Sequence, residues 1–181
     1  IEHCYLQADP SNVVRNEVRN YAINQNFYFY KLRNHEGTLR NLIIRTATTG
    51  ELMVIVVFAF ADENQIQSMM VFLKERFPEI TSLLYIINQK KNDTIFDQDI
   101  HVFAGRDHIF ELMPTDNPDG SGLMFKIGPK SFYQTNSDQA HELYKITRDF
   151  AGFKGDELVY DLYTGAGTIA NFIAGSVRKV I

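Results

Sequence analysis

Near its C-terminus the chain runs Glu157-Leu158-Val159-Tyr160-Asp161-Leu162-Tyr163-Thr164-Gly165-Ala166-Gly167-Thr168-Ile169-Ala170-Asn171-Phe172. This stretch predicts a buried strand, a glycine turn and the start of a helix. Backbone N–H groups at such a helix N-terminus can meet a nucleotide-like ligand. Each further parallel strand needs a crossover of a dozen or more residues. Because the chain begins with Ile1 instead of Met and ends at Ile181, we expect an internal fragment that only opens an α/β domain.

The glycine turn admits more than one interpretation. Gly165 and Gly167 allow a sharp turn and let a ligand approach without a Cβ in the way. A turn without any ligand is one alternative. The spacing Gly165-x-Gly167-x-x-Ala170 also fits a relaxed dinucleotide fingerprint, whose discriminating acidic residue, about 20 positions further on, would lie beyond Ile181. An acidic residue at the strand end, here Asp161, is more typical of S-adenosylmethionine-dependent methyltransferases, and the run from Asp161 to Thr168 resembles their first motif.

Composition indicates an ordinary packed protein. The 181 residues are 45% hydrophobic and 22% charged, with a net charge of -4, which argues against a strongly basic nucleic-acid binder. Residues 1–45 carry six basic and four acidic side chains, so this part has a charge of +2 and the remainder -6. Ordinary variation of surface charge is one explanation of this asymmetry. A first half that faces RNA is the more specific alternative. No secretory signal opens the chain, and the apolar run 52–61 is too short for a membrane helix, so we expect a cytoplasmic protein without membrane contact.

Periodicity predicts the elements before the glycine turn. We expect a helix from Ser11 and a hairpin of 39–47 and 51–60. The apolar face of that helix is predicted to carry Val14, Val18, Tyr21 and Ala22. Asp62 is expected to cap a second helix, with Gln65 as its capping-box partner and an apolar stripe of Ile66, Met69, Met70, Leu73 and Phe77. Further strands are expected near 83–88, 101–103, 108–112 and 123–127. Asn136 is expected to cap a helix whose buried stripe contains Leu143, Ile146 and Phe150. The turn cluster 115–122 places a domain boundary after residue 122.

A second motif precedes the glycine turn, namely Lys130-Ser131-Phe132-Tyr133-Gln134-Thr135-Asn136. Together the two blocks resemble the RNA uracil-C5 methyltransferases, the family of the 23S rRNA and tRNA 5-methyluridine enzymes. The resemblance implies an α+β central domain, residues 1–122, for RNA recognition. It implies that residues 123–181 are the start of an α/β Rossmann-like, S-adenosylmethionine-dependent methyltransferase domain.

The same resemblance assigns roles to individual residues. The cofactor-binding positions are Gln134, Asp161, Tyr163, Gly165, Gly167 and Thr168. Phe132 falls where an aromatic ring can pack near a flipped-out target base, since unstacking a base in RNA loses contacts that an aromatic face partly replaces. A core aromatic is the alternative for Phe132, and a surface amide or a hydrogen bond at the helix start is the alternative for Gln134.

The segment Ile1-Glu2-His3-Cys4-Tyr5-Leu6-Gln7 resembles the one that carries the last of four cysteines binding a [4Fe–4S] cluster in the rRNA branch. Cys4 is therefore a metal-ligand candidate for the parent protein, and a buried apolar thiol is the alternative. With one cysteine, this chain alone is not expected to hold the cluster. Between the motifs, residues 37–41 and Arg45 are candidates for phosphate contact, and a solvated strand edge explains them equally well.

The implied reaction is methyl transfer to C5 of a uridine in RNA, with 23S rRNA as the expected partner and no protein partner inferred. The family's nucleophilic cysteine and its general base lie in later motifs. We therefore expect no catalytic residue in this chain and no activity from the chain alone. The alternatives are the tRNA-specific branch, a non-catalytic RNA-binding relative, and a small-molecule methyltransferase or nicotinamide enzyme. The Cys4 context argues against the first of these, and the Phe132-x-Gln134-x-Asn136 block argues against the last.

Overall fold

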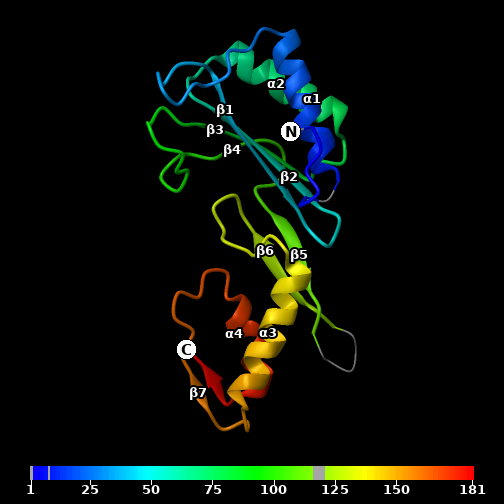
Figure 1. The fold of residues 1–181 in the computed structure, drawn as a ribbon, viewed down its shortest axis with the longest axis vertical. Helices are drawn as coiled ribbons and strands as arrows, with labels where there is room; N and C mark the ends of the chain where they lie inside the picture. Colours follow the sequence, from blue (N-terminus) through cyan, green and yellow to red (C-terminus); the bar gives the residue numbers. More distant parts are fainter. Residues whose placement is uncertain (1, 8, 116–120) are drawn as a thin grey trace. The chain divides into compact units, whose positions relative to one another are not determined.

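The computed structural model describes residues 2–7, 9–115 and 121–181. The chain divides into two compact units, Ile1–Ile109 and Phe110–Ile181 (Figure 1). Each unit has its own secondary structure. In the described part of the chain, no helix combines the length and the apolar character that a bilayer crossing needs.

The first unit is built on a four-stranded sheet. Its strands are β1 (Leu39–Thr46), β2 (Leu52–Phe58), β3 (Ser82–Ile87) and β4 (His101–Gly105), in the order β1-β2-β3-β4. β1 and β2 form the predicted antiparallel hairpin, with Ile43 opposite Ile55, and Gly50 turns it with a φ of 83°. β3 runs parallel to β2 and β4 antiparallel to β3.

Two helices, α1 (Ser11–Asn24) and α2 (Glu63–Arg76), cover one face of this sheet (Figure 1). Alternate β2 side chains, Val54, Val56 and Phe58, are buried in the core with the helices. The core side chains of α1 are Val14, Val18 and Ala22, and those of α2 are Ile66, Met69, Met70 and Leu73. These stripes were predicted from helical spacing, because one face of each helix must leave water.

The caps of α2 explain where this helix begins and ends. Gln65 N donates to the Asp62 side chain at 3.0 Å, as predicted. The reciprocal half of a capping box is not seen, since the buried Gln65 Oε1 has no partner among the described residues. The helix ends at Arg76, shortly before Pro78, which cannot continue a helix.

The second unit contains the strand pair β5 (Ile109–Met113) and β6 (Leu123–Ile127), of which Ile109 lies in the first unit. It continues with α3 (Ser137–Ala151), β7 (Leu158–Val159), α4 (Thr168–Ile173), the short 3-10 helix η1 (Ala174–Ser176) and β8 (Lys179–Val180). β7 and β8 are parallel, with Leu158 opposite Lys179, so β7, α4 and β8 form a strand-helix-strand crossover.

The unit boundary differs from the domain boundary expected after residue 122. It falls between Ile109 and Phe110. The cause is the pairing of β5 with β6, which makes the turn-rich segment the connection within a strand pair and not a linker. Residues 116–120 of that turn cluster lie outside the described residues. The assignment of an RNA-recognition domain and a methyltransferase domain stays a prediction.

The apolar stripe expected to be buried on α3 is exposed, which corrects the prediction. Leu143 is 54%, Ile146 51% and Phe150 89% exposed. The side of α3 that is covered carries Ala140 and Tyr144, and the Tyr144 ring lies 6.1 Å from that of Phe172 on α4. Periodicity reveals that a helix has an apolar face, but it does not reveal which face a neighbouring element covers.

The strand before the glycine turn is also more exposed than predicted. The strand β7 consists of Leu158 and Val159, and Leu158 and Tyr160 are 43% and 62% exposed. A parallel strand is buried on both faces only where further elements cover both. The described second unit covers β7 incompletely, so the expected buried strand is wrong in this chain.

Candidate cofactor site

The segment 161–167 connects β7 to α4 through three residues with positive φ. They are Tyr163 (64°), Gly165 (57°) and Gly167 (73°). Thr164 Oγ1 donates to Asp161 O at 3.0 Å and Gly167 N donates to Thr164 O at 2.8 Å, which holds the turn in shape. A side chain other than glycine is uncommon at such a φ. Tyr163 is fully exposed at this position, so its ring is presented outward from the turn.

Gly167 is the N-cap of α4 and is buried. Asn171 Nδ2 donates to Gly167 O at 2.7 Å, so the first turn of the helix is tied to the glycine. A Cβ at position 167 would lie 3.0 Å from Asn171 Nδ2, a distance at which the amide must shift. The positive φ and the close amide both explain why glycine stands here.

Tyr144 on α3 reaches the start of α4. Its hydroxyl and Thr168 Oγ1 share a hydrogen bond of 3.1 Å, and Tyr144 is only 4% exposed. This bond ties the helix after the second motif to the first residue of the helix after the glycine turn. The helix that follows the second block is therefore connected directly by a side chain to the block of the glycine turn.

The two blocks line one cavity of about 200 Å³ in the second unit. Its lining comes from the segment before α3, from α3 and from the turn into α4. The predicted site residues in this lining are Phe132, Gln134, Asp161, Tyr163, Gly165 and Thr168. Gly167 does not line the cavity, because it is buried at the N-cap of α4. Sequence reasoning left out other lining residues, namely Tyr133, Leu143, Tyr144, Leu162, Thr164, Ala166 and Ile169.

Two alternatives from the sequence can be compared with these positions. Phe132 is 70% exposed, which does not fit a core aromatic. The helix start is capped by Asn136, whose Oδ1 accepts from Gln139 N at 3.1 Å, so the capping role considered for Gln134 belongs to Asn136. Gln134 is exposed and lines the cavity, so the surface-amide alternative fits its position.

Tyr133 gives the cavity a phenol that stays protonated. Burial raises its pKa to about 12, and the negative charge of Glu111 acts in the same direction. Its ring lies 5.8 Å from that of Phe125 on β6. Tyr133 stands inside the quoted motif and Tyr144 follows the predicted stripe residue Leu143, but neither spacing nor composition assigns a role to them.

Beside this cavity the same unit has a second one of about 360 Å³. It is lined by Leu123, Met124, Phe125, Lys126, Ser131, Ala166 and Asn171. Ala166 of the glycine turn lines both cavities, so the two cavities adjoin at this turn.

Cys4 lies in the first unit, apart in sequence from the residues of the cavity. Its backbone forms a reciprocal pair with the Asn12 side chain: Cys4 N donates to Oδ1 at 2.9 Å, and Asn12 Nδ2 donates to Cys4 O at 3.1 Å. No group of three metal-ligating side chains occurs within residues 2–7, 9–115 and 121–181. Since an iron–sulfur cluster of this type uses four cysteine thiolates, the donor set of this chain does not fit one by itself.

The second unit combines a strand, a glycine turn and a helix with an acidic residue after the strand, an arrangement found in α/β domains that bind nucleotide cofactors. No family model matches the chain. The chain is 58% identical over 184 residues to a protein of Bacteroides thetaiotaomicron named uncharacterized RNA methyltransferase, covering 100% of this chain and 39% of that protein. A protein of the same name from Porphyromonas gingivalis is 53% identical over 183 residues, covering 100% and 38%.

The chain is therefore homologous to these RNA methyltransferases along its whole length, and the resemblance identified in the sequence is confirmed at the level of an RNA methyltransferase. It spans about two fifths of the length of these relatives. A solved structure of similar fold is the Pyrococcus abyssi tRNA (uracil-54, C5)-methyltransferase in complex with S-adenosyl-L-homocysteine. The TM-score is 0.73 at 23% identity, covering 96% of this chain and 40% of that one, and shows the mixed α/β fold alone.

Proposed function

We propose that this chain provides part of the cofactor site of an S-adenosylmethionine-dependent RNA uracil-C5 methyltransferase. The observation that carries the proposal is the cavity where the Phe132-to-Asn136 block and the Asp161-to-Thr168 turn meet. These blocks are separate in sequence, and the resemblance to RNA uracil-C5 methyltransferases depends on both of them. A shared cavity is what a joint role in one site requires.

The donor set of the cavity fits such a cofactor. S-adenosylmethionine supplies an electrophilic methyl group on a sulfonium and carries ribose hydroxyls and an amino group that need acceptors. Asp161 and Gln134 offer carboxylate and amide oxygens, and Tyr163 and Tyr133 offer aromatic faces. The volume of about 200 Å³ is below the roughly 300 Å³ at which ligand pockets usually begin. The described residues accordingly line one part of the complete site.

In this proposal, Gln134, Asp161, Tyr163 and Thr168 contact the cofactor, while Gly165 and Gly167 let the backbone come close to it. Phe132, exposed at the same cavity, packs against the target base once that base leaves its stack. A ring exposed to this extent loses water on contact with a base, which favours such packing.

No catalytic residue is proposed in this chain. The thiolate that adds to C6 of uracil and the base that removes the C5 proton fall, by the resemblance, in later motifs of the family. Cys4 belongs to the first unit and is not proposed as the nucleophile. We expect the isolated 181-residue chain to transfer no methyl group.

The proposed substrate is 23S rRNA in the cytoplasm, and the proposed role of Cys4 is that of a fourth [4Fe–4S] ligand in the whole protein. The Cys4 segment supports this branch. The second candidate is a tRNA substrate. It is favoured by the similarity in fold to the Pyrococcus abyssi tRNA (uracil-54, C5)-methyltransferase, with a TM-score of 0.73. A non-catalytic RNA-binding relative is the alternative outside enzymes.

The test uses the complete protein encoded by the gene, purified without oxygen. Tritiated methyl transfer from S-adenosylmethionine is measured on unmodified 23S rRNA and on unmodified tRNA, and the product nucleoside is identified by mass spectrometry. We expect 5-methyluridine in 23S rRNA and a brown protein. Label in tRNA alone with a colourless protein would support the second candidate. A different methylated nucleoside, or no transfer to either RNA, would contradict the proposal.

A further inference from the structure

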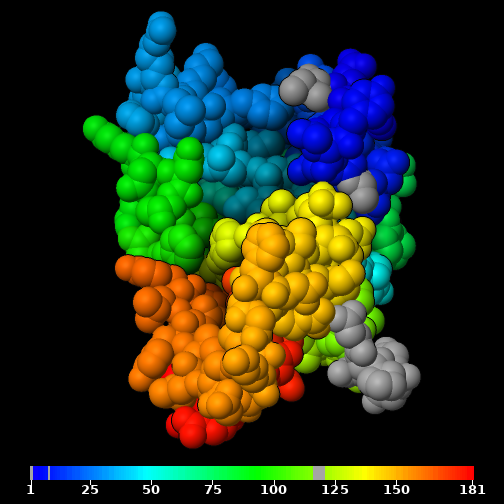
Figure 2. Space-filling model, turned by 60° about the horizontal axis from the view of Figure 1, so that its bottom comes forward, coloured from blue at the N-terminus to red at the C-terminus, as the bar shows by residue number. Residues whose placement is uncertain are grey.

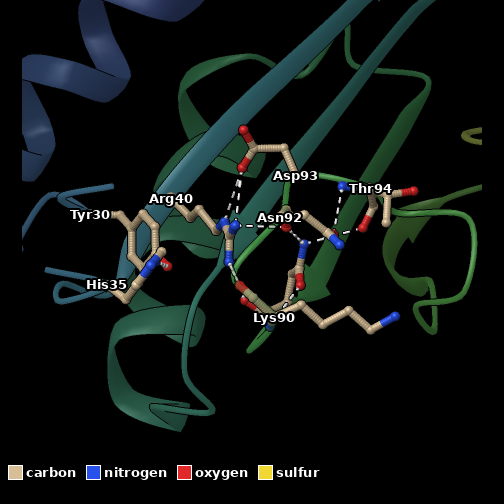
Figure 3. Close-up of polar contacts among 8 residues, drawn as sticks. Tyr30, His35, Arg40, Lys90, Asn92, Asp93 and Thr94 are labelled. Carbon is tan, nitrogen blue, oxygen red and sulfur yellow. Dashed lines mark hydrogen bonds and ion pairs between the residues drawn. The ribbon is translucent and has the colours of Figure 1, made fainter. Parts of the chain in front are cut away.

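Arg40 on β1 is the centre of a polar network in the first unit (Figure 3). Its side chain is 1% exposed. Nη1 donates to Asn88 O at 2.9 Å and to Lys90 O, and Nη2 donates to Asn92 O at 2.7 Å. Nη2 and Nε also reach Asp93 Oδ1, at 3.0 and 3.3 Å. The phosphate contact considered for Arg40 is therefore wrong, because its donors are directed into the protein.

The acceptors of Arg40 belong to one loop, residues 88–94, which follows β3. Asn88 is fully buried and closes the loop from inside. Its Nδ2 donates to Asn92 O at 3.1 Å and to Thr94 O at 3.2 Å, while its Oδ1 accepts from Lys90 N at 3.0 Å. Arg40 and Asn88 together fix the backbone of this loop, which leaves the Lys90 and Lys91 side chains on the exposed side.

Arg40 also supports a second loop, residues 28–37, which precedes β1. Its guanidinium lies 4.4 Å from the centre of the Tyr30 ring, and the Tyr30 hydroxyl shares a hydrogen bond of 2.9 Å with His35 Nδ1. A bridge between Lys31 and Glu36 closes the loop. At Gly37 a Cβ would lie 2.5 Å from Phe29 O, so the backbone crosses itself closely there. One buried cation thus holds two loops in place.

The outer side of these two loops combines aromatic and cationic side chains. Tyr28 is 45% and Phe29 41% exposed, and Lys31, Arg33 and Lys91 are exposed as well. Lys31 Nζ lies 4.9 Å from the centre of the Tyr28 ring. Figure 2 shows the light-blue and green segments of the two loops side by side on the first unit, in agreement with their common contact to Arg40.

We propose that loops 28–37 and 88–94 form a surface that binds unpaired RNA, with Tyr28 and Phe29 stacking on bases and Lys31, Arg33 and Lys91 contacting phosphates. The proposal rests on the proposed function, which supplies RNA as the substrate class. Stacking on aromatic side chains beside cations is how proteins bind single-stranded RNA. Arg40 is a positioning residue for this surface and does not contact RNA.

The charge of the surface favours RNA over an acidic protein partner. Lys90 is paired with Asp97, so its charge is neutralised locally. Lys31, Arg33 and Lys91 stand against Glu36 on the outer side. An excess of cations next to two exposed aromatic rings suits a phosphate chain that alternates with flat bases.

The test measures binding of the complete protein to fluorescein-labelled single-stranded oligouridine and to its double-stranded counterpart over a range of salt concentrations. The double variant Lys31→Ala/Arg33→Ala is compared with Arg19→Ala/Lys74→Ala, which removes two exposed cations from the helical side of the same unit. We expect only the loop variant to weaken binding. Its slope of log affinity against log salt should fall by about one for each lost phosphate contact.

A second pair of variants separates stacking from loop damage. Tyr28→Ala should weaken binding to the single strand by roughly five-fold or more, while Tyr28→Phe keeps the ring and should bind like the unchanged protein. The proposal is overturned if the loop variant binds like its control, if Tyr28→Phe is as weak as Tyr28→Ala, or if the duplex is preferred.

The same variants distinguish this proposal from the proposed function. If the unchanged protein methylates RNA and the loop variants bind and methylate normally, the proposed function stands and the binding surface is overturned. If the protein methylates no RNA and the loop variants still lose affinity selectively, the binding surface stands and the proposed function is contradicted.

Discussion

At the scale of single residues, Tyr144 shows how two separate motifs are held together. Its hydroxyl shares a 3.1 Å hydrogen bond with Thr168, a proposed cofactor contact, and its ring is buried. Tyr144 thereby fixes the side chain that begins α4. Tyr144 lies in the helix after the second motif, but its partner lies too far along the chain to be predicted from spacing.

The variant Tyr144→Phe should weaken binding of S-adenosylhomocysteine to the complete protein by about two- to ten-fold, because one hydrogen bond contributes about 0.5–1.5 kcal/mol. Isothermal titration calorimetry measures this. Tyr21→Phe is the matched control, since it removes a tyrosine hydroxyl that shares a 2.8 Å hydrogen bond with Ser68 in the other unit. Equal losses for both variants would show that Tyr144 has no particular role in the cofactor site.

The raised pKa of Tyr133 predicts how the stability of the protein changes at alkaline pH. Burial raises its pKa in the folded state to about 12, above the ordinary tyrosine value of about 10. Below about pH 10 the phenol is protonated in both states, and its contribution to stability is fully present. Between pH 10 and 12 the unfolded chain loses this proton first, so the contribution is lost as pH rises. Denaturant unfolding should therefore show a smaller decline over this interval for Tyr133→Phe, and parallel pH profiles would contradict the assignment.

At the scale of elements, the glycine turn depends on backbone geometry. Gly167→Ala should reduce the free energy of unfolding by about 1–2 kcal/mol, because an L side chain is strained at a φ of 73° and must also displace Asn171. Gly152→Ala is the control, with a φ of 59° but no atom within 4 Å of the added Cβ. Both should lose stability in thermal unfolding, but only Gly167→Ala should also lose cofactor affinity. Loss of affinity in both would contradict this.

The Arg40 network predicts that two loops are rigid because of one side chain. Arg40→Met should lower the free energy of unfolding by about 2–3 kcal/mol, since hydrogen bonds to a charged group contribute about that amount. Hydrogen exchange of the backbone amides in loops 28–37 and 88–94 should accelerate together. Arg33→Met, at an exposed position, is the control and should change neither. Acceleration in one loop alone would contradict the shared support.

Local sequence patterns predicted the elements of this protein well where the cause is local. The hairpin of β1 and β2, the Asp62 and Asn136 caps and the apolar stripe of α2 follow from residues within a few positions of one another. The exposed stripe of α3 and the burial of Arg40 were mispredicted, because each depends on distant segments. Arg40 is enclosed by a loop that follows β3, and the residues near Arg40 in sequence do not predict this contact.

At the scale of the whole molecule, the two units have different proposed roles. The second unit holds the cavity that the motifs line, and the first holds the Arg40 network and Cys4. The match to uncharacterized RNA methyltransferases covers all of this chain and hence both units, at 58% and 53% identity. Both units therefore belong to one homologous stretch, and the RNA-binding surface proposed on the first complements the cofactor site proposed on the second.

The central claim is that the cavity between the two motifs binds the methyl donor. A crystal structure of the complete protein with S-adenosylhomocysteine tests it most directly. We predict electron density for the ligand in contact with Gln134, Asp161, Tyr163 and Thr168, with Phe132 exposed beside it. Density at a site that none of these residues reaches, in crystals where this cavity is open to solvent, would contradict the account.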